Sequence, residues 1–223
     1  MNVALFGGTF DPVHSGHIAA AREAAKCFAL DEIHFVPATI PPHKQHRPLS
    51  AFAHRYAMVS LACAEEPRFV PSLLEAHAGR PNYSIDTVRK MRSMLEPEDR
   101  LYFVVGADAF RGISTWHQPE ALLDACDFIV VSRPGFPLEH IESAIPPAQR
   151  GGLSARGESG VVEATIALRR TCLHLLTTVH ADISSSHIRK LAARGESLEG
   201  LVPENVAEYI RKVNLFRDEV RME

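Results

Sequence analysis

Residues 7–17 are Gly7-Gly8-Thr9-Phe10-Asp11-Pro12-Val13-His14-Ser15-Gly16-His17, and this stretch decides the fold of the 223-residue chain. An apolar run at 3–6 precedes it and predicts a β-strand, and an alanine-rich helical pattern at 18–30 follows it. A strand, a glycine turn and a helix N-terminus form an anion-binding arrangement, because glycines let backbone N–H groups approach a phosphate and the helix dipole favours negative charge. The stretch therefore predicts a nucleotide site.

Two histidines, His14 and His17, lie three residues apart in this stretch. Residues at i and i+3 share a helix face, so both imidazoles are expected to face one site above the turn, where they can donate hydrogen bonds to phosphate oxygens. The spacing matches neither the G-x-G-x-x-G dinucleotide motif nor the G-x-x-x-x-G-K-[ST] P-loop. A plain glycine turn with two helix-capping histidines is the structural alternative.

Residues 7–17 resemble the nucleotidyltransferase superfamily, whose signature is (H/T)-x-G-H, and within it the nicotinate-nucleotide adenylyltransferase family. The resemblance implies an α/β fold with a doubly wound, mostly parallel sheet (the Rossmann-like nucleotidyltransferase fold) and a small C-terminal helical part. It also implies transfer of the adenylyl group of ATP to nicotinate mononucleotide. Mg²⁺ would be carried by the ATP phosphates, with no metal ligand from protein side chains.

Apolar runs and helical periods alternate along the chain, which predicts parallel strands joined by right-handed crossovers, with ligands at the carboxyl ends of the strands. Helices are expected from Ser50 to about 65, from a cap at Asn82 or Ser84, and from Pro203 onward. Residues 136–160 have little periodicity and predict a loop with at most one short helix. The remaining strands are predicted at 33–38, 69–75 (with Pro71 favouring an edge), 101–105, 127–131 and 172–179.

Length and composition predict one α/β domain: a nucleotide-binding part at 1–181, completed by a C-terminal helical segment at 182–223. The net charge of −3 gives no basic excess, so nucleic acid is not expected as a partner. No apolar run approaches the roughly 20 residues that span a bilayer, so we expect a cytoplasmic protein without membrane association. The four cysteines are far apart, which is typical of reduced core residues. The sequence leaves a homo-oligomer open.

The segment at 39–48 is expected to be a loop because of its prolines, and it contains Lys44. Without the first motif, a solvated loop would be the simpler interpretation. In the resembled family, a Pro-Pro-His-Lys loop follows the second strand and lines the ATP site. The resemblance therefore assigns Lys44 to phosphate binding.

A second motif, Ile-Ser-Ser-x-x-Ile-Arg, occupies 183–189 directly after a predicted strand. Its serines can cap a helix and offer hydroxyl and backbone donors at the positive helix end, and Arg189 lies one turn further on. The superfamily has this motif at the ATP triphosphate. We therefore expect residues 183–189 to face the first phosphate turn.

Between the two motifs, three features predict a second substrate. In the resembled family, a Tyr-x-x-x-Thr pattern, here Tyr83 to Thr87, faces the carboxylate of the pyridine ring. Gly106-x-Asp108 at a strand end suits ribose hydroxyls, and Trp116 would stack on the pyridine. Helix capping by 82–84 and a core tryptophan are the structural alternatives.

The predicted site has three groups of residues. The catalytic group is His14, His17, Lys44 and Arg189. The ATP-binding group is Gly7, Gly8, Thr9, Phe10, Gly16, Gly106, Asp108, Ile183, Ser184 and Ser185. The mononucleotide-binding group is Tyr83, Thr87, Trp116 and Arg133, the last being able to meet either a phosphate or a surface carboxylate. The alternatives are an adenylyltransferase acting on nicotinamide mononucleotide or phosphopantetheine, or a nucleotide-binding protein without catalysis.

Overall fold

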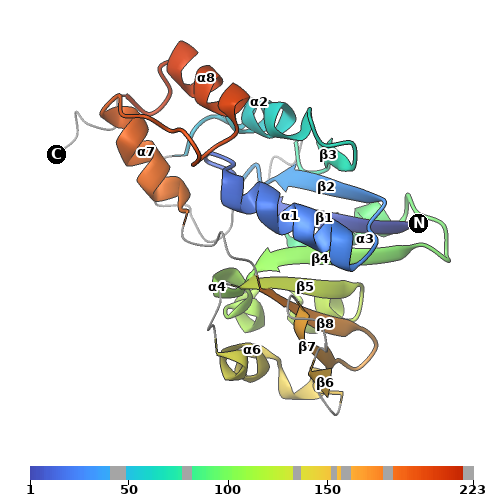
Figure 1. The fold of residues 1–223 in the computed structure, drawn as a ribbon. Coiled ribbons are helices and arrows are strands. Elements are labelled where there is room, and N and C mark those ends of the chain that lie inside the picture. Colours follow the sequence, from blue (N-terminus) through green and yellow to red (C-terminus); the bar gives the residue numbers. More distant parts are fainter. Residues whose placement is uncertain are drawn as a thin grey trace.

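The computed structural model describes residues 1–40, 49–76, 82–132, 137–151, 155–156, 162–177 and 183–217. Within these ranges one sheet has the strand order β3-β2-β1-β4-β5-β8-β7-β6 (Figure 1). The strands are β1 (Asn2–Gly8), β2 (Glu32–Pro37), β3 (Phe69–Pro71), β4 (Arg100–Gly106), β5 (Asp127–Ser132), β6 (Ala155–Arg156), β7 (Val162–Ala167) and β8 (Cys172–Thr177). The helices are α1 (Ser15–Cys27), α2 (Phe52–Cys63), α3 (Ser84–Arg92), α4 (Ala107–Phe110), α5 (Pro119–Leu123), α6 (Leu138–Ala144), α7 (Ser185–Ala193) and α8 (Glu204–Lys212), with short 3₁₀ turns at Ile113–Thr115 and Pro147–Gln149.

Neighbouring strands in the series β3-β2-β1-β4-β5-β8 are parallel. Strand β7 pairs antiparallel with both β8 and β6, at one side of the sheet. Strand order reverses between β1 and β4, because the chain winds outward from β1 in one direction and from β4 in the other. Ligands in open α/β sheets bind at such a switch point, beyond the carboxyl ends of the strands. The predicted doubly wound, mostly parallel fold is confirmed.

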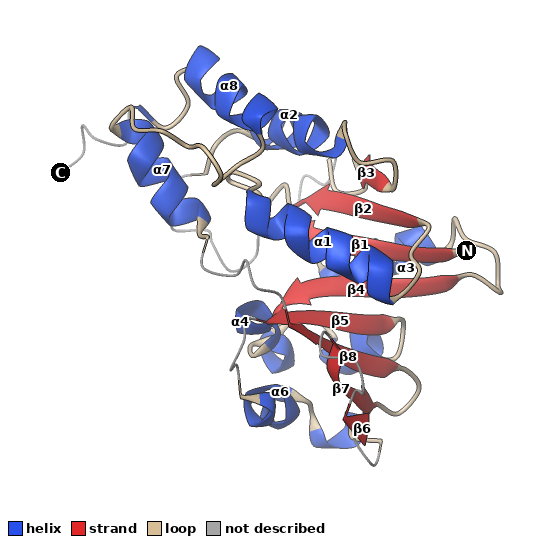
Figure 2. Cartoon of the chain, in the orientation of Figure 1, coloured by secondary structure: helices blue, strands red, loops and turns tan. Residues whose placement is uncertain are grey.

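The central strand β1 is buried on both faces, which explains its continuous apolar sequence. Val3 and Leu5 belong to the core beneath α3, α4, α5 and α6, and Ala4 and Phe6 belong to the core beneath α1, α2, α7 and α8. Figure 2 shows α1 in front of the sheet and α3 behind it. Alternate side chains of β1 thus pack against the helical layers on the two faces of the sheet.

The C-terminal helices pack into the same core as the first helix. Ile188 of α7 and Val206 and Ile210 of α8 belong to the hydrophobic cluster that contains Ile18 of α1. In the same region, the hydroxyl of Tyr209 lies 2.8 Å from Nδ1 of His54 on α2. In the described ranges, no helix is long and apolar enough to cross a membrane.

Three predictions of local structure are wrong. Strand β3 ends at Pro71, although an edge position is confirmed for it. Ala51, not Ser50, precedes α2, because the Ser50 N–H donates to Asp11 and its carbonyl accepts from Arg55.

The third wrong prediction concerns the start of α3 and its cap. Tyr83 precedes this helix, and neither Asn82 nor Ser84 caps it with a side-chain hydrogen bond. The cap of α7 is as predicted, since the Ser184 hydroxyl accepts from the His187 N–H at 3.2 Å.

The region expected to be a loop contains more structure than its composition indicates. It includes the predicted short helix, α6, but also the two-residue strand β6, which pairs with β7. Strand β7 was not predicted. Its buried residues Ala164 and Ile166 alternate with half-buried positions, the period-2 signal of a strand packed on one face.

Candidate active site

A cavity of about 1110 Å³ lies at the switch point of the sheet, at the carboxyl ends of β1 and β4. Helix α7 lies beyond these strand ends (Figure 1). The lining includes Gly7, Gly8 and Thr9 after β1 and Gly106 and Asp108 after β4. The predicted phosphate turn and the predicted ribose-binding acid therefore open into one space.

The phosphate turn depends on close packing behind it. Phe10 adopts a positive φ of 49°, is 2% exposed and does not line the cavity. A Cβ added to Gly8 would lie 2.9 Å from Cζ of the Phe10 ring. Position 8 therefore needs a glycine to leave room for the Phe10 ring, in addition to any role in anion binding.

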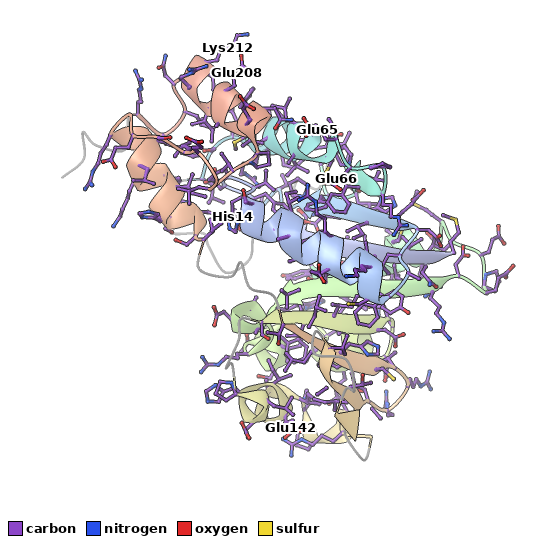
Figure 3. All side chains as sticks on the ribbon, viewed as in Figure 1. His14, Glu65, Glu66, Glu142, Glu208 and Lys212 are labelled. Atoms are coloured by element: carbon purple, nitrogen blue, oxygen red, sulfur yellow. The ribbon has the colours of Figure 1, made fainter. Side chains whose placement is uncertain are left out.

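His14 and His17 both line the cavity, as their spacing predicts. Their rings stack with centroids 3.6 Å apart. The backbone N–H of His14 donates to Nδ1 of His17 at 3.2 Å. His14 lies at the end of α1 nearest α7 (Figure 3). Burial lowers the pKa of His14 to about 4, so its ring is neutral at pH 7.

The second motif packs behind the first one. The Ser185 hydroxyl donates to the Pro12 carbonyl at 3.0 Å, and the buried Arg189 guanidinium donates to the Asp11 carbonyl at 2.7 Å. Within the motif, Ile183 is the residue that lines the cavity. The two motifs are thus in direct contact, but Ser185 and Arg189 reach the backbone of the turn and not the cavity itself.

The predicted mononucleotide end has an aromatic wall. Tyr83 and Trp116 line the cavity, and the Tyr83 ring stacks on His117 with centroids 4.2 Å apart. Trp116 meets Phe103 edge to face. These rings offer flat apolar surface on which a pyridine can stack.

Thr87 lies at the same end and has a partner that sequence reasoning missed. Its hydroxyl donates to Oε1 of Glu75 at 2.6 Å, and Glu75 also lines the cavity. Burial raises the pKa of Glu75, and the hydrogen bond from Thr87 opposes this shift. An acid shortly after a strand was the signal used for Asp108, and the same signal applies to Glu75 after β3. His117 was missed as well, although it directly follows Trp116.

The other predicted residues fall in three places. Gly16 lines the cavity, whereas Ser184 is exposed at the start of α7 and does not. Lys44 and Arg133 lie outside the described residues. In the part of the chain that the structure describes, no lysine or arginine lines the cavity, and no three potential metal ligands among His, Cys, Asp and Glu lie together.

Comparisons with known proteins identify relatives of the whole chain. Residues 5–191 match the cytidylyltransferase-like family. The chain is 39% identical, over 98% of its length and 99% of the relative, to a probable nicotinate-nucleotide adenylyltransferase of Citrifermentans bemidjiense. It is 41% identical to the probable nicotinate-nucleotide adenylyltransferase of Solibacter usitatus, over 97% of this chain and 100% of the relative.

A solved structure shares the fold. The nicotinic acid mononucleotide adenylyltransferase of Plasmodium falciparum, complexed with NaAD, superposes with a TM-score of 0.73 at 21% identity, covering 97% of each chain.

Proposed function

This chain belongs to the cytidylyltransferase-like family and, within it, to the nicotinate-nucleotide adenylyltransferases, and we propose that it transfers the adenylyl group of ATP to nicotinate mononucleotide. The products are nicotinate adenine dinucleotide and pyrophosphate, a step of NAD biosynthesis. The observation that carries this proposal is a cavity lined both by the glycine–histidine turn and by aromatic residues beside Thr87.

The reaction needs no covalent intermediate on the protein. A phosphate oxygen of the mononucleotide, already ionised at neutral pH, attacks the α-phosphorus of ATP. The bond between this phosphorus and the oxygen bridging to the β-phosphorus breaks, and pyrophosphate leaves with the electron pair. The protein contributes positioning and charge stabilisation.

In this proposal, the first motif holds the phosphates around the attacked phosphorus. His17 and His14 donate hydrogen bonds from one helix face, and the N–H groups of the turn at Gly7, Gly8 and Thr9 approach the oxygens. Neutral imidazole still carries one N–H donor, so His14 can contribute without being charged. Gly16 lets α1 begin close to the phosphates.

The departing pyrophosphate is assigned to Lys44 and to the N-terminus of α7 with Ser184. Ile183 lines the same space, and Gly106 and Asp108 bind the nucleoside. Ser185 and Arg189 serve this end through the carbonyls of Pro12 and Asp11 that they hold. This placement changes their expected role from direct phosphate contacts to support of the turn.

Mg²⁺ fits this site as a companion of ATP. The described cavity lining offers isolated carboxylates rather than a cluster of ligands, and phosphate oxygens are ligands that Mg²⁺ prefers. Bound with ATP, the ion would supply positive charge beside the phosphates.

Recognition of the second substrate is proposed to rest on Tyr83, Thr87 and Trp116, with Arg133 at the phosphate of the mononucleotide. Free N–H groups at the start of α3 suit the two acceptors of a carboxylate better than an amide, which has one donor end. Nicotinate mononucleotide should therefore be used more efficiently than nicotinamide mononucleotide.

A pyrophosphate-release assay tests the proposal. The protein is incubated with ATP, Mg²⁺ and, separately, nicotinate mononucleotide, nicotinamide mononucleotide and phosphopantetheine. We expect the highest kcat/KM with nicotinate mononucleotide. Equal values for the two pyridine nucleotides would refute the carboxylate recognition alone, and release only with phosphopantetheine would refute the assigned substrate. No release with any acceptor would refute catalysis.

A further inference from the structure

Arg55 of α2 is a buried cation that does not line the cavity. Its side chain is 2% exposed, and its guanidinium lies over the Phe52 ring, 5.6 Å from the centroid. A buried arginine is costly unless its donors are satisfied. The partners that satisfy Arg55 therefore indicate its role.

Each of these partners is a backbone carbonyl. Arg55 donates to Thr9 at 2.8 Å, to Ala38 at 2.7 Å and to Ser50 at 3.0 Å, with a longer contact to Thr39 at 3.4 Å. Thr9 belongs to the phosphate turn, and Ala38 follows the carboxyl end of β2. One guanidinium thus joins three separate segments of chain beside the cavity.

The bond to Thr9 constrains the phosphate turn directly. The C=O and N–H of a trans peptide point in opposite directions, so holding the Thr9 carbonyl fixes the direction of the Phe10 N–H. Thr9 itself lines the cavity. Arg189 donates to the Asp11 carbonyl, so two arginines hold carbonyls of the turn, at Thr9 and at Asp11.

Charge reinforces this geometry. Burial lowers the pKa of Arg55 and the nearby Asp11 carboxylate opposes the shift, while a guanidinium stays protonated at neutral pH in any protein environment. The Asp11 carboxylate also accepts from the Ser50 N–H at 3.2 Å. A charged guanidinium, balanced by the Asp11 carboxylate, therefore holds a turn that is proposed to bind a triphosphate.

We propose that Arg55 is a positioning residue for ATP, which fixes the phosphate turn and the chain after β2 through their carbonyls. This inference rests on the proposed adenylyltransferase function. Arg55 touches no substrate. Its loss should weaken ATP binding and turnover more than binding of the mononucleotide, because the short bonds go to Thr9, Ala38 and Ser50 and only the 3.4 Å contact leads through Thr39 toward Glu75.

The test compares Arg55→Lys with Met58→Ala, using the full chain. Lysine keeps the charge but cannot hold three carbonyls in the planar geometry of a guanidinium. Met58 is fully buried on the same helix, so Met58→Ala controls for lost stability of α2. Binding of a non-hydrolysable ATP analogue with Mg²⁺ and of nicotinate mononucleotide is measured by calorimetry, together with both KM values and kcat.

We expect Arg55→Lys to weaken binding of the ATP analogue about tenfold or more, as the loss of one well-placed charge-assisted hydrogen bond would. Binding of the mononucleotide should change less than twofold. Met58→Ala should lower the melting temperature without weakening ATP-analogue binding relative to mononucleotide binding. Unchanged analogue binding in Arg55→Lys, or equal weakening of both ligands, would overturn the proposal.

The calorimetric binding measurements do not require that the protein turns over its substrates. A wild-type protein that binds the analogue but transfers nothing refutes the proposed function, and the calorimetric comparison still decides the role of Arg55. If Arg55→Lys does not fold, Arg55→Met in the presence of added guanidinium ions provides the second variant. Restored ATP-analogue binding would support the positioning role, and a folded protein without restoration would contradict it.

Discussion

His14 and His17 share a helix face but differ in exposure, since His14 is 9% exposed and His17 is half-buried. Burial holds His14 neutral, and its Nδ1 has no hydrogen-bond partner among the described residues. Such a ring costs less free energy to bury neutral than protonated. The free energy of unfolding should therefore depend on the protonation state of the His14 ring.

The pKa of His14 is lowered from 6.5 to about 4, so the unfolded chain binds the proton more tightly. The contribution of neutral His14 to stability is fully present above pH 6.5 and is lost as the pH falls toward 4, by at most about 3 kcal/mol. Urea unfolding at pH 7 and pH 4.5 should therefore show a smaller loss of stability for His14→Gln than for the wild type. Identical losses would contradict the burial of His14.

His17 carries a catalytic prediction. If each charge-assisted hydrogen bond to phosphate is worth roughly 1.5–3 kcal/mol, His17→Ala should lower kcat about ten- to a hundredfold without abolishing it. The control is His34→Ala, since His34 pairs with Glu32 and does not line the cavity. Wild-type turnover in a folded His17→Ala protein would show that the assigned role is wrong.

Gly8 and Gly106 form a matched pair, because both line the cavity but differ in their surroundings. A Cβ at Gly8 meets the buried Phe10 ring, whereas a Cβ at Gly106 has nothing within 4 Å. Gly8→Ala should cost about 1–3 kcal/mol of unfolding free energy, in the range of overpacked cores, while Gly106→Ala should be close to neutral. Equal urea midpoints for the two variants would argue against this packing.

At the scale of elements, the sequence predicts best where one physical signal dominates. β1, β4 and β5 contain continuous apolar runs, and β2 and β8 are apolar runs that one histidine interrupts. The predicted ends of these five strands lie within two residues of the observed ones. β7 lies at the antiparallel edge beside β6, and its weaker alternation was missed. The cap of α7 was predicted correctly, but the cap of α2 was not, because the Ser50 backbone is used in tertiary hydrogen bonds that no local pattern contains.

The connection from β3 to α3 gives a prediction of its own. The Glu75 carboxylate accepts a hydrogen bond from the Thr87 hydroxyl, and the Glu75 backbone carbonyl accepts one from the hydroxyl of Thr39 after β2. Glu75→Leu would leave Thr87 without this acceptor, and we expect the KM for nicotinate mononucleotide to rise about tenfold, as for the loss of one hydrogen bond. Glu75→Gln keeps an acceptor oxygen and should stay near the wild-type value.

Steady-state kinetics with each substrate varied in turn distinguish this local role from general damage. The KM for ATP should stay within twofold of the wild type in Glu75→Leu, because the Glu75 carboxylate bonds to Thr87 and not to the phosphate turn. A parallel rise in both KM values would indicate a loss of structure, and an unchanged KM for the mononucleotide would remove Glu75 from the site.

At the scale of the whole molecule, the site combines segments that are far apart in sequence. Ser185 bonds to Pro12, 173 residues away, and Arg189 to Asp11, 178 residues away. Sequence reasoning placed both motifs at the carboxyl edge of the sheet, because parallel strands end there. It did not foresee that the second motif supports the backbone of the first, since that depends on how α7 packs against the turn.

The central claim is that this cavity joins an adenylyl group to a pyridine mononucleotide, and the fate of labelled ATP tests it most directly. Wild-type protein is incubated with ATP labelled at the α-phosphate, Mg²⁺ and nicotinate mononucleotide, and the products are separated. We predict that the label appears in a dinucleotide, with one pyrophosphate released for each dinucleotide formed. Label that stays in ATP, or that appears in AMP or ADP without dinucleotide, would contradict the account.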